Sequence, residues 1–302
     1  MSLLDTPLCE LLGIEFPIVQ APMANNAGPE LAAAVSRAGA LGSVAGATIS
    51  PDELRAEIRE VRAATDRPFA VNLFAPPYLR DENLEVVLDE RPAALLFTFG
   101  IVDPAPLHEA GIVVLGTATT AEEARALERV GVDAVVAQGG EAGGHRGSFL
   151  DGWPLVPLDE LVPACVEAVS VPVVAAGGIM DGARIAEMLR LGAAGVSLGT
   201  AFLFTPEAGR PREHLDAIRT LDTVVTDAYT GRPMRAARTP VLEELMAGPP
   251  PLPFPEQRAV SAGAGPLYMG GTGAPRGREL EAAELVRRLV EETEAPTERG
   301  PA

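Results

Sequence analysis

The chain has 302 residues, enough for one large α/β barrel or for two ordinary domains, and 47% of them are hydrophobic. Its formal net charge of −18 argues against nucleic acid as a partner, because phosphate backbones are bound by clustered basic residues. No stretch reaches the roughly 18 apolar residues of a membrane span, and the N-terminus has no basic start before a long apolar run, so we expect a cytoplasmic protein with no membrane partner.

Short apolar runs alternate with helical patterns at spacings of roughly 20 to 35 residues, which is typical of repeated βα units. The first five runs begin at Phe16, Ala40, Pro68, Ala93 and Gly111. They are followed by predicted helices that begin near Pro29, Pro51, Glu82, Pro104 and Ala121. The second helix has the clearest start, because Ser50 can cap it, Pro51 suits its first position and Glu53 can complete a capping box. Thr120 is expected to cap the fifth helix.

The sixth run begins at Ala134 and leads into an irregular passage through Trp153 and a helix over residues 157–170. The seventh begins at Val171 and precedes a helix capped by Asp181, and the eighth begins at Ala194. These runs are continuously apolar, as strands buried on both faces should be. Eight strands, each followed by a helix or turn, predict an α/β fold, a closed (β/α)₈ TIM barrel over residues 1–205.

The pattern changes after residue 205. We expect residues 206–264 to form an inserted lid or small substrate domain over the barrel mouth, with one helix over 206–220 and an extended stretch over 223–238. Residues 246–257 are too rich in proline for a helix or a central strand. Residues 265–295 read as a glycine turn and an amphipathic helix that closes the barrel, and residues 296–302 as a disordered tail.

Two absences narrow the chemistry. Every basic residue among the 24 is arginine, so Schiff-base aldolase chemistry, pyridoxal phosphate attachment and a P-loop lysine are all excluded. Cys9 and Cys165 lie far apart without CxxC spacing, so neither a disulfide framework nor a metal site is predicted.

The active site of such a barrel forms at the carboxyl ends of its strands. The seventh and eighth strands both end in glycine-containing turns that lead into helices, around Gly177 and Gly178 and over Ser197 to Thr200. Backbone N–H groups in such turns bind anions, and this position is where barrels of this type bind phosphate. The alternative is that these glycines only make tight turns.

Other strand ends carry neutral amides. Asn72 and Gln138 can donate and accept hydrogen bonds in the plane of a heteroaromatic ring, and Met23, after Ala21 and Pro22, can present a polarizable face to it or be plain core. Together with the phosphate turns, these residues indicate a site for flavin mononucleotide (FMN).

The sixth strand ends in the sequence AQGGEAGGHRG, where glycines surround His145, one of only three histidines in the chain. A glycine-rich loop lets backbone approach a ligand, and a histidine there can exchange a proton near neutral pH. His145 is therefore a candidate catalytic residue, against the alternative of an incidental histidine in a surface turn. Arg146 either adds positive charge to the site or forms a surface salt bridge.

FPIVQAPMA, VNLF, FTFG, AQGGEAGGHRG, PVVAAGGI and SLGTAFL occur in this order across the barrel, and together they resemble the nitronate monooxygenase family, formerly called 2-nitropropane dioxygenases. The resemblance implies an FMN-dependent (β/α)₈ enzyme that oxidises alkyl nitronates, such as propionate 3-nitronate, with O₂, and leaves a homodimer open. It implies that His145 is catalytic and that FMN is lined by Ala21, Pro22, Met23, Asn72, Gln138, Gly143, Gly144, Gly177, Gly178, Ser197, Leu198, Gly199 and Thr200.

Two roles are open for His145. A positively charged imidazole would hold a nitronate anion over the flavin, whereas a neutral one could remove the α-proton of a nitroalkane.

Related barrels leave alternatives. The flavin-dependent enoyl-acyl-carrier-protein reductases share the EAGGH segment, and other relatives are NAD(P)H:quinone reductases. In the reductases we expect QGGM near the first strand and a glutamate at position 138, so Gln20 to Met23 and Gln138 favour the monooxygenases. A barrel that binds flavin without turnover is a third alternative. The chain departs from the family pattern at Gly271, where members carry glutamine.

Overall fold

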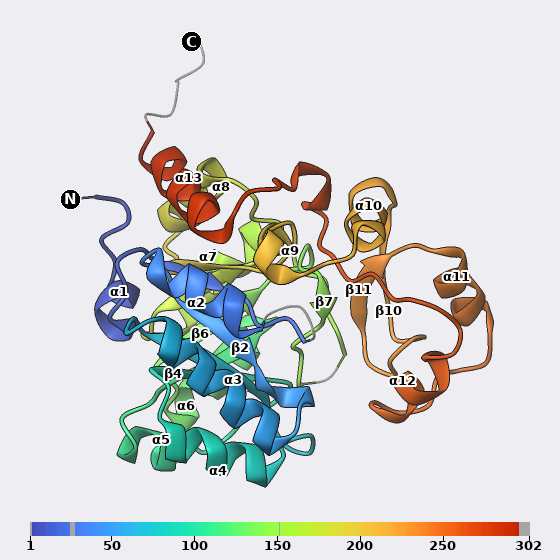
Figure 1. Ribbon diagram of the computed structural model, residues 1–302, viewed down its shortest axis with the longest axis horizontal. Coiled ribbons are helices and arrows are strands. Elements are labelled where there is room, and N and C mark those ends of the chain that lie inside the picture. The colour runs from blue at the N-terminus through green and yellow to red at the C-terminus, as the bar shows by residue number, and fades with distance from the viewer. Residues whose placement is uncertain (1, 25–27, 151, 296–302) are drawn as a thin grey trace.

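The computed structural model describes residues 2–24, 28–150 and 152–295, and its main feature is a barrel of eight parallel strands (Figure 1). The strands are β1 (Ile18–Gln20), β2 (Gly42–Ala45), β3 (Phe69–Phe74), β4 (Ala94–Thr98), β5 (Val113–Ala118), β6 (Ala134–Gln138), β8 (Val173–Ala176) and β9 (Gly195–Leu198). β1 pairs with β9, and the Gln20 backbone N–H donates to the Leu41 carbonyl at 2.8 Å beside β2, which closes the barrel. The predicted (β/α)₈ fold is confirmed.

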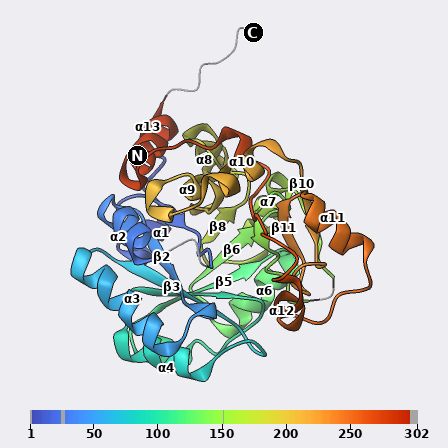
Figure 2. The same cartoon turned by 45° about the vertical axis from the view of Figure 1, so that its right-hand side comes forward.

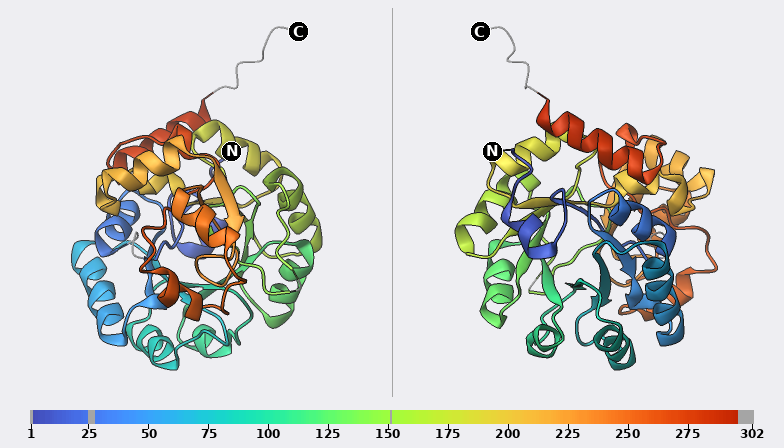
Figure 3. Two further views of the ribbon diagram at one scale, coloured as in Figure 1. Left: turned by 90° about the vertical axis from the view of Figure 1, so that its right-hand side faces the viewer. Right: turned by 60° about the vertical axis from the view of Figure 1, so that its left-hand side comes forward.

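Helices surround the barrel as an outer ring (Figure 3). They are α2 (Pro29–Arg37), α3 (Pro51–Ala64), α4 (Asp81–Glu90), α5 (Ala105–Glu109), α6 (Ala121–Val130), α7 (Leu158–Ala168), α8 (Gly182–Arg190) and α13 (Ala282–Glu294). The three predicted caps are confirmed, since the side chains of Ser50, Thr120 and Asp181 each accept a backbone N–H of the first turn. α13 packs between α8 and α2, where it takes the place of an eighth outer helix.

A short N-terminal helix, α1 (Pro7–Leu12), lies across the end of the barrel opposite its mouth (Figure 3, right). Leu8 and Leu12 are buried there in one apolar cluster with Leu96 and Leu115 from the barrel strands. Gly195 makes room for this contact, because a Cβ atom at that position would lie 2.3 Å from a Leu8 methyl. The helix was not predicted from the sequence. Its packing closes the floor of the barrel, so a ligand enters from the other end.

The chain after β9 builds the mouth of the barrel (Figure 2). Its elements are α9 (Thr200–Leu203), the 3₁₀ helix η2 (Pro206–Ala208), α10 (Arg212–Thr220), β10 (Thr223–Thr226), β11 (Met234–Ala237), α11 (Pro240–Ala247), α12 (Glu256–Ser261) and η3 (Ala274–Arg276). We call residues 223–267 the mouth segment. β10 and β11 continue antiparallel into β7 (Gly144–His145), which follows β6, so this small sheet ties the mouth segment to the barrel.

The prediction of one helix over 206–220 is wrong. Gly209 takes a left-handed conformation with φ of +61° and ends η2, and Pro211 precedes the first residue of α10. Between Gly248 and Pro255 the proline-rich stretch has no helix or strand, as expected, although α11 and α12 extend into its two ends. The predicted disordered tail, 296–302, lies outside the described residues. No helix in the described part of the chain is long and apolar enough to cross a membrane.

Candidate active site

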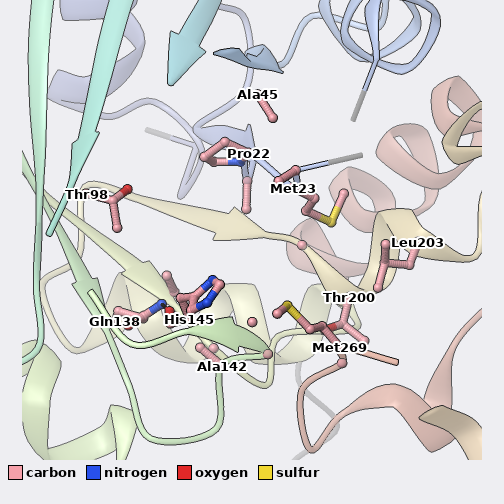
Figure 4. Close-up of a pocket in the computed structure, with 18 of the residues that line it drawn as sticks. Pro22, Met23, Ala45, Thr98, Gln138, Ala142, His145, Thr200, Leu203 and Met269 are labelled. Atoms are coloured by element: carbon pink, nitrogen blue, oxygen red, sulfur yellow. Dashed lines mark hydrogen bonds between the residues drawn. The ribbon is translucent and has the colours of Figure 1, made fainter. Parts of the chain in front are cut away.

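A cavity of about 710 Å³ lies at the carboxyl end of the barrel, between the strand ends and the mouth segment (Figure 4). Its volume is in the range of small-molecule and cofactor sites. All the site residues predicted from the sequence line it: Ala21, Pro22, Met23, Asn72, Gln138, Gly143, Gly144, His145, Gly177, Gly178, Ser197, Leu198, Gly199 and Thr200. The fold therefore gathers residues from the ends of five barrel strands around one space.

Two turns on one side of the cavity offer free backbone donors. The amides of Gly177, Gly178, Thr200 and Ala201 donate to no other described residue. Gly177 and Gly178 have φ of +129° and +67°, a conformation that favours glycine, and a Cβ atom at Gly177 would lie 3.1 Å from the Ala142 nitrogen. Converging N–H groups without protein acceptors are suited to the oxygens of a phosphate.

The two amide side chains are used differently. Asn72 Nδ2 donates to the Leu96 carbonyl at 2.9 Å and to Thr98 Oγ1 at 3.1 Å, which leaves Oδ1 without a donor among the described residues. Gln138 Nε2 donates to the His145 carbonyl at 3.0 Å, and its Oε1 accepts the Gly147 amide at 2.8 Å. Asn72 can therefore accept from a bound ring, whereas Gln138 holds the loop that carries His145.

His145 projects from β7 into the cavity (Figure 4), and its neighbours keep it neutral. Burial, together with the positive charges of Arg232 and Arg258, lowers the pKa of its imidazole to about 3. At neutral pH the side chain is therefore a base and not a cation. Of the two roles open from the sequence, this environment favours removal of a proton over ionic attraction of an anion.

An aromatic cluster surrounds the His145 ring. Phe99 and Phe254 meet it edge-on with centroids 5.8 and 5.5 Å away, and Tyr78 packs against both phenylalanines. The Arg232 guanidinium lies over the Phe99 ring, 3.9 Å from its centroid. Phe99 itself has φ of +78°, a strained conformation for a bulky residue. The cluster fixes the imidazole and excludes water from that side of it.

The cavity is positively charged although the whole chain is acidic. Arg210 and Arg258 line it, and no Asp or Glu is found among its described lining residues. The Arg258 guanidinium forms no hydrogen bond or ion pair with any residue that the structure describes, so its charge is available to a ligand. Such a site attracts anions.

Arg146 is not a surface residue, and the expectation of a salt bridge is wrong. It is fully buried, and its guanidinium donates to the carbonyls of Gly139 at 2.6 Å and of Gln138 at 2.9 Å. Burial lowers its pKa to about 10, so it remains charged at neutral pH. It clamps the ends of the glycine loop from inside, and its contribution to the site is through the position of that loop.

The departure at Gly271 has a structural reason. The turn at Gly270 and Gly271 lies against the glycine loop, and a Cβ atom on Gly143 would be 2.4 Å from the Gly271 nitrogen. A Cβ atom on Gly271 would in turn be 2.7 Å from the Glu141 carbonyl oxygen. The Gly271 amide donates to Thr200 Oγ1 at 2.9 Å. Backbone contacts the backbone here, so no glutamine side chain fits in this arrangement.

Several lining residues were not predicted. Tyr229, Thr230, Arg258, Leu267 and Met269 reach the cavity from the mouth segment and the turn after it. The first four lie in stretches without hydrophobic periodicity or a motif, and no local signal marks them, whereas Met269 directly precedes the turn whose family pattern is noted at Gly271. Phe99 had one indirect signal, because it precedes Gly100 in the FTFG strand end.

Comparison with known proteins finds relatives that match nearly the whole chain. The family model described as nitronate monooxygenase matches residues 5–83 and 77–292. The nitronate monooxygenase of Pseudomonas aeruginosa is 41% identical, over 93% of this chain and 97% of the relative. Among solved structures, the nitroalkane oxidase of Streptomyces ansochromogenes is 38% identical with a TM-score of 0.88, covering 95% of this chain and 97% of that one. FabK of Thermotoga maritima is 32% identical with a TM-score of 0.83, covering 96% of each.

Proposed function

The chain belongs to the nitronate monooxygenase family, and we propose that it is an FMN-dependent enzyme that oxidises alkyl nitronates, such as propionate 3-nitronate, with molecular oxygen. Members of this family and their structural neighbours depend on a flavin. The observation that carries the proposal is one cavity where a neutral His145 meets backbone amides and the Arg258 guanidinium, none of which has a partner among the described residues.

The residues present fit FMN. The amides of Gly177, Gly178, Thr200 and Ala201 would hold its phosphate, Asn72 Oδ1 would accept a ring N–H, and Pro22 and Met23 would pack on the ring system. When bound, the flavin supplies electron transfer from the nitronate and reaction with oxygen. The size of the cavity leaves room for a small substrate beside the cofactor.

The chain itself provides binding and proton transfer. Arg258 attracts the negative charge of a nitronate, and residues 206–264 act as a lid that shields the reaction from water. For a neutral nitroalkane, His145 removes the α-proton and so generates the nitronate within the cavity. The low pKa of His145 keeps the imidazole unprotonated at neutral pH, so a ring lone pair is present to accept the proton, while its weak basicity limits the rate of that step.

The alternative of an NAD(P)H-dependent reductase is not favoured. FabK is less similar to this chain than the nitroalkane oxidase, at 32% against 38% identity and a TM-score of 0.83 against 0.88. Position 138 is glutamine, and its amide is bonded within the His145 loop.

The proposal is tested by following oxygen consumption after propionate 3-nitronate is added to the FMN-loaded protein. We expect uptake that depends on both the nitronate and FMN. With nitroethane as substrate, His145→Asn should lose about 100-fold or more, the usual contribution of a general base. His108→Asn is the matched control, because His108 bonds Asp133 on the surface outside the cavity. No oxygen uptake with any alkyl nitronate would overturn the proposal.

A further inference from the structure

Thr230, in the mouth segment, forms a hydrogen bond with His145. The other hydrogen-bond partners of the Thr230 hydroxyl determine which of the two residues donates. Its Oγ1 lies 3.1 Å from His145 Nε2, 2.8 Å from the Arg232 carbonyl oxygen and 3.3 Å from the Arg232 backbone nitrogen. A hydroxyl has one proton to donate and two lone pairs to accept with. Three partners therefore share one donor and two acceptor positions.

The roles of two of these partners are fixed by their chemistry. The Arg232 carbonyl can only accept, and among the described residues Thr230 is its one donor. The Arg232 backbone N–H can only donate. The Thr230 proton thus goes to the carbonyl at the shorter distance, and one lone pair takes the Arg232 N–H. The second lone pair of Thr230 Oγ1 is therefore the one that points toward His145, and it can form a hydrogen bond only if Nε2 carries a proton.

The other ring nitrogen faces the cavity. His145 Nδ1 forms no hydrogen bond with a described residue. It is nevertheless accessible, because the fully enclosed side-chain atoms without a partner do not include it. The edges of Phe99 and Phe254 hold the ring on two sides, so it cannot turn over without displacing them. Nδ1 therefore retains its lone pair on the side of the ring that lines the cavity.

We propose that Thr230 is a positioning residue that fixes His145 in its Nε2–H tautomer and makes Nδ1 the atom that accepts the substrate proton. The inference rests on the proposed function, since it assigns an atom to the base in that site. In the proton transfer, the α C–H bond of a nitroalkane breaks, its electron pair stays on the substrate as the nitronate, and a new N–H bond forms at Nδ1.

The resulting imidazolium carries an N–H on both nitrogens. Its Nε2–H remains bonded to Thr230, so the ring does not move during the step, and the Nδ1 proton is later released to water. The charged groups that act on the ring are Arg232 and Arg258, both from the mouth segment, and both favour return to the neutral form.

The tautomer can be read directly by ¹⁵N NMR of the FMN-loaded protein with labelled histidine, using His145→Asn to assign the signal. We expect a protonated Nε2 and an unprotonated Nδ1 at neutral pH in the wild type and in Thr230→Ser, which keeps the hydroxyl. Thr230→Val keeps the shape but can neither accept nor donate, so the signal should shift toward a mixture of tautomers.

Kinetics provide the second readout. Thr230→Val should lower kcat/KM for nitroethane by about 10- to 100-fold, while ethylnitronate, which needs no proton removal, changes less than about threefold. Thr230→Ser should restore most of the nitroethane activity. A wild-type spectrum with the proton on Nδ1 would overturn the inference even if Thr230→Val does not fold. The inference would also be overturned if Thr230→Val kept both the wild-type tautomer of His145 and the wild-type activity with nitroethane. If the wild type oxidises neither compound, the proposed function fails instead.

Discussion

Adding one methyl group at Gly143 should separate the glycine loop from the turn at Gly270 and Gly271. Gly143 has no positive φ, so the effect of Gly143→Ala is purely steric. The new Cβ would lie 2.4 Å from the Gly271 nitrogen and 2.5 Å from the Gly270 carbonyl carbon. Both are backbone atoms that cannot turn away, and ordinary contact begins at 3.4 Å, so the two segments must separate by 3.4 − 2.4, or 1.0 Å.

This displacement has two expected costs. Overpacking of this kind lowers the free energy of unfolding by about 1 to 3 kcal/mol. A shift of about 1 Å in the loop that carries His145, two residues later, can reduce activity about 100-fold. Urea unfolding measures the first cost, and oxygen consumption with nitroethane measures the second.

Gly144→Ala is the matched control one residue further. There the nearest atom to a new Cβ is Met269 Sδ at 3.9 Å, and only the φ of +73° is unfavourable. The expected loss is about 1 kcal/mol of backbone strain, with a smaller loss of activity. The reasoning is refuted if Gly143→Ala is as stable and as active as the wild type, or is less affected than Gly144→Ala.

Three further substitutions test separate parts of the site. Arg258→Gln should raise KM for propionate 3-nitronate about threefold to tenfold and change KM for nitroethane by less, because only the nitronate is an anion that the arginine attracts, while on nitroethane the lost charge acts only through His145; equal effects on both KM values in initial-rate measurements would contradict this. Removing the charge of Arg232 by Arg232→Met should raise the pKa of His145 from about 3. A base is lost as pH falls through its pKa, so the acid limb of nitroethane turnover, which lies near about pH 3 in the wild type, should move to higher pH in the variant; a profile identical to the wild type would count against the assignment. Gly178→Ala, with φ of +67° and Glu141 Cβ 3.2 Å from the new methyl, should weaken FMN more than riboflavin in a fluorescence titration, since only FMN has a phosphate; an equal loss for both would argue against a phosphate at that turn.

The parts of the fold that could be predicted are those determined by neighbouring residues. The capping box at Ser50 and Glu53 and the continuous apolar runs are local features, and the structure confirms both. The cavity residues at the strand ends could also be predicted, because parallel strands bring their carboxyl ends to one edge wherever the chain places them. The break before α10 had a local signal as well, in the adjacent Gly209 and Pro211.

The remaining features depend on contacts between distant segments. Thr230 reaches His145 across 85 residues, through a sheet in which β7 contributes only two residues. Arg146 is buried because three backbone carbonyls converge on it, and nothing in the sequence HRG distinguishes it from an exposed arginine. The role of His145 also depended on tertiary structure, since its charge state is set by burial and by two arginines of the mouth segment.

The central claim is that this cavity uses a flavin to take electrons from a nitronate. The most direct measurement is the visible flavin absorbance of the FMN-loaded protein, recorded without oxygen after adding propionate 3-nitronate in one sample and NADPH in another. We expect the oxidised spectrum to change with the nitronate, to remain with NADPH, and to return when oxygen is admitted. Bleaching by NADPH with no response to the nitronate would contradict the account and indicate a reductase.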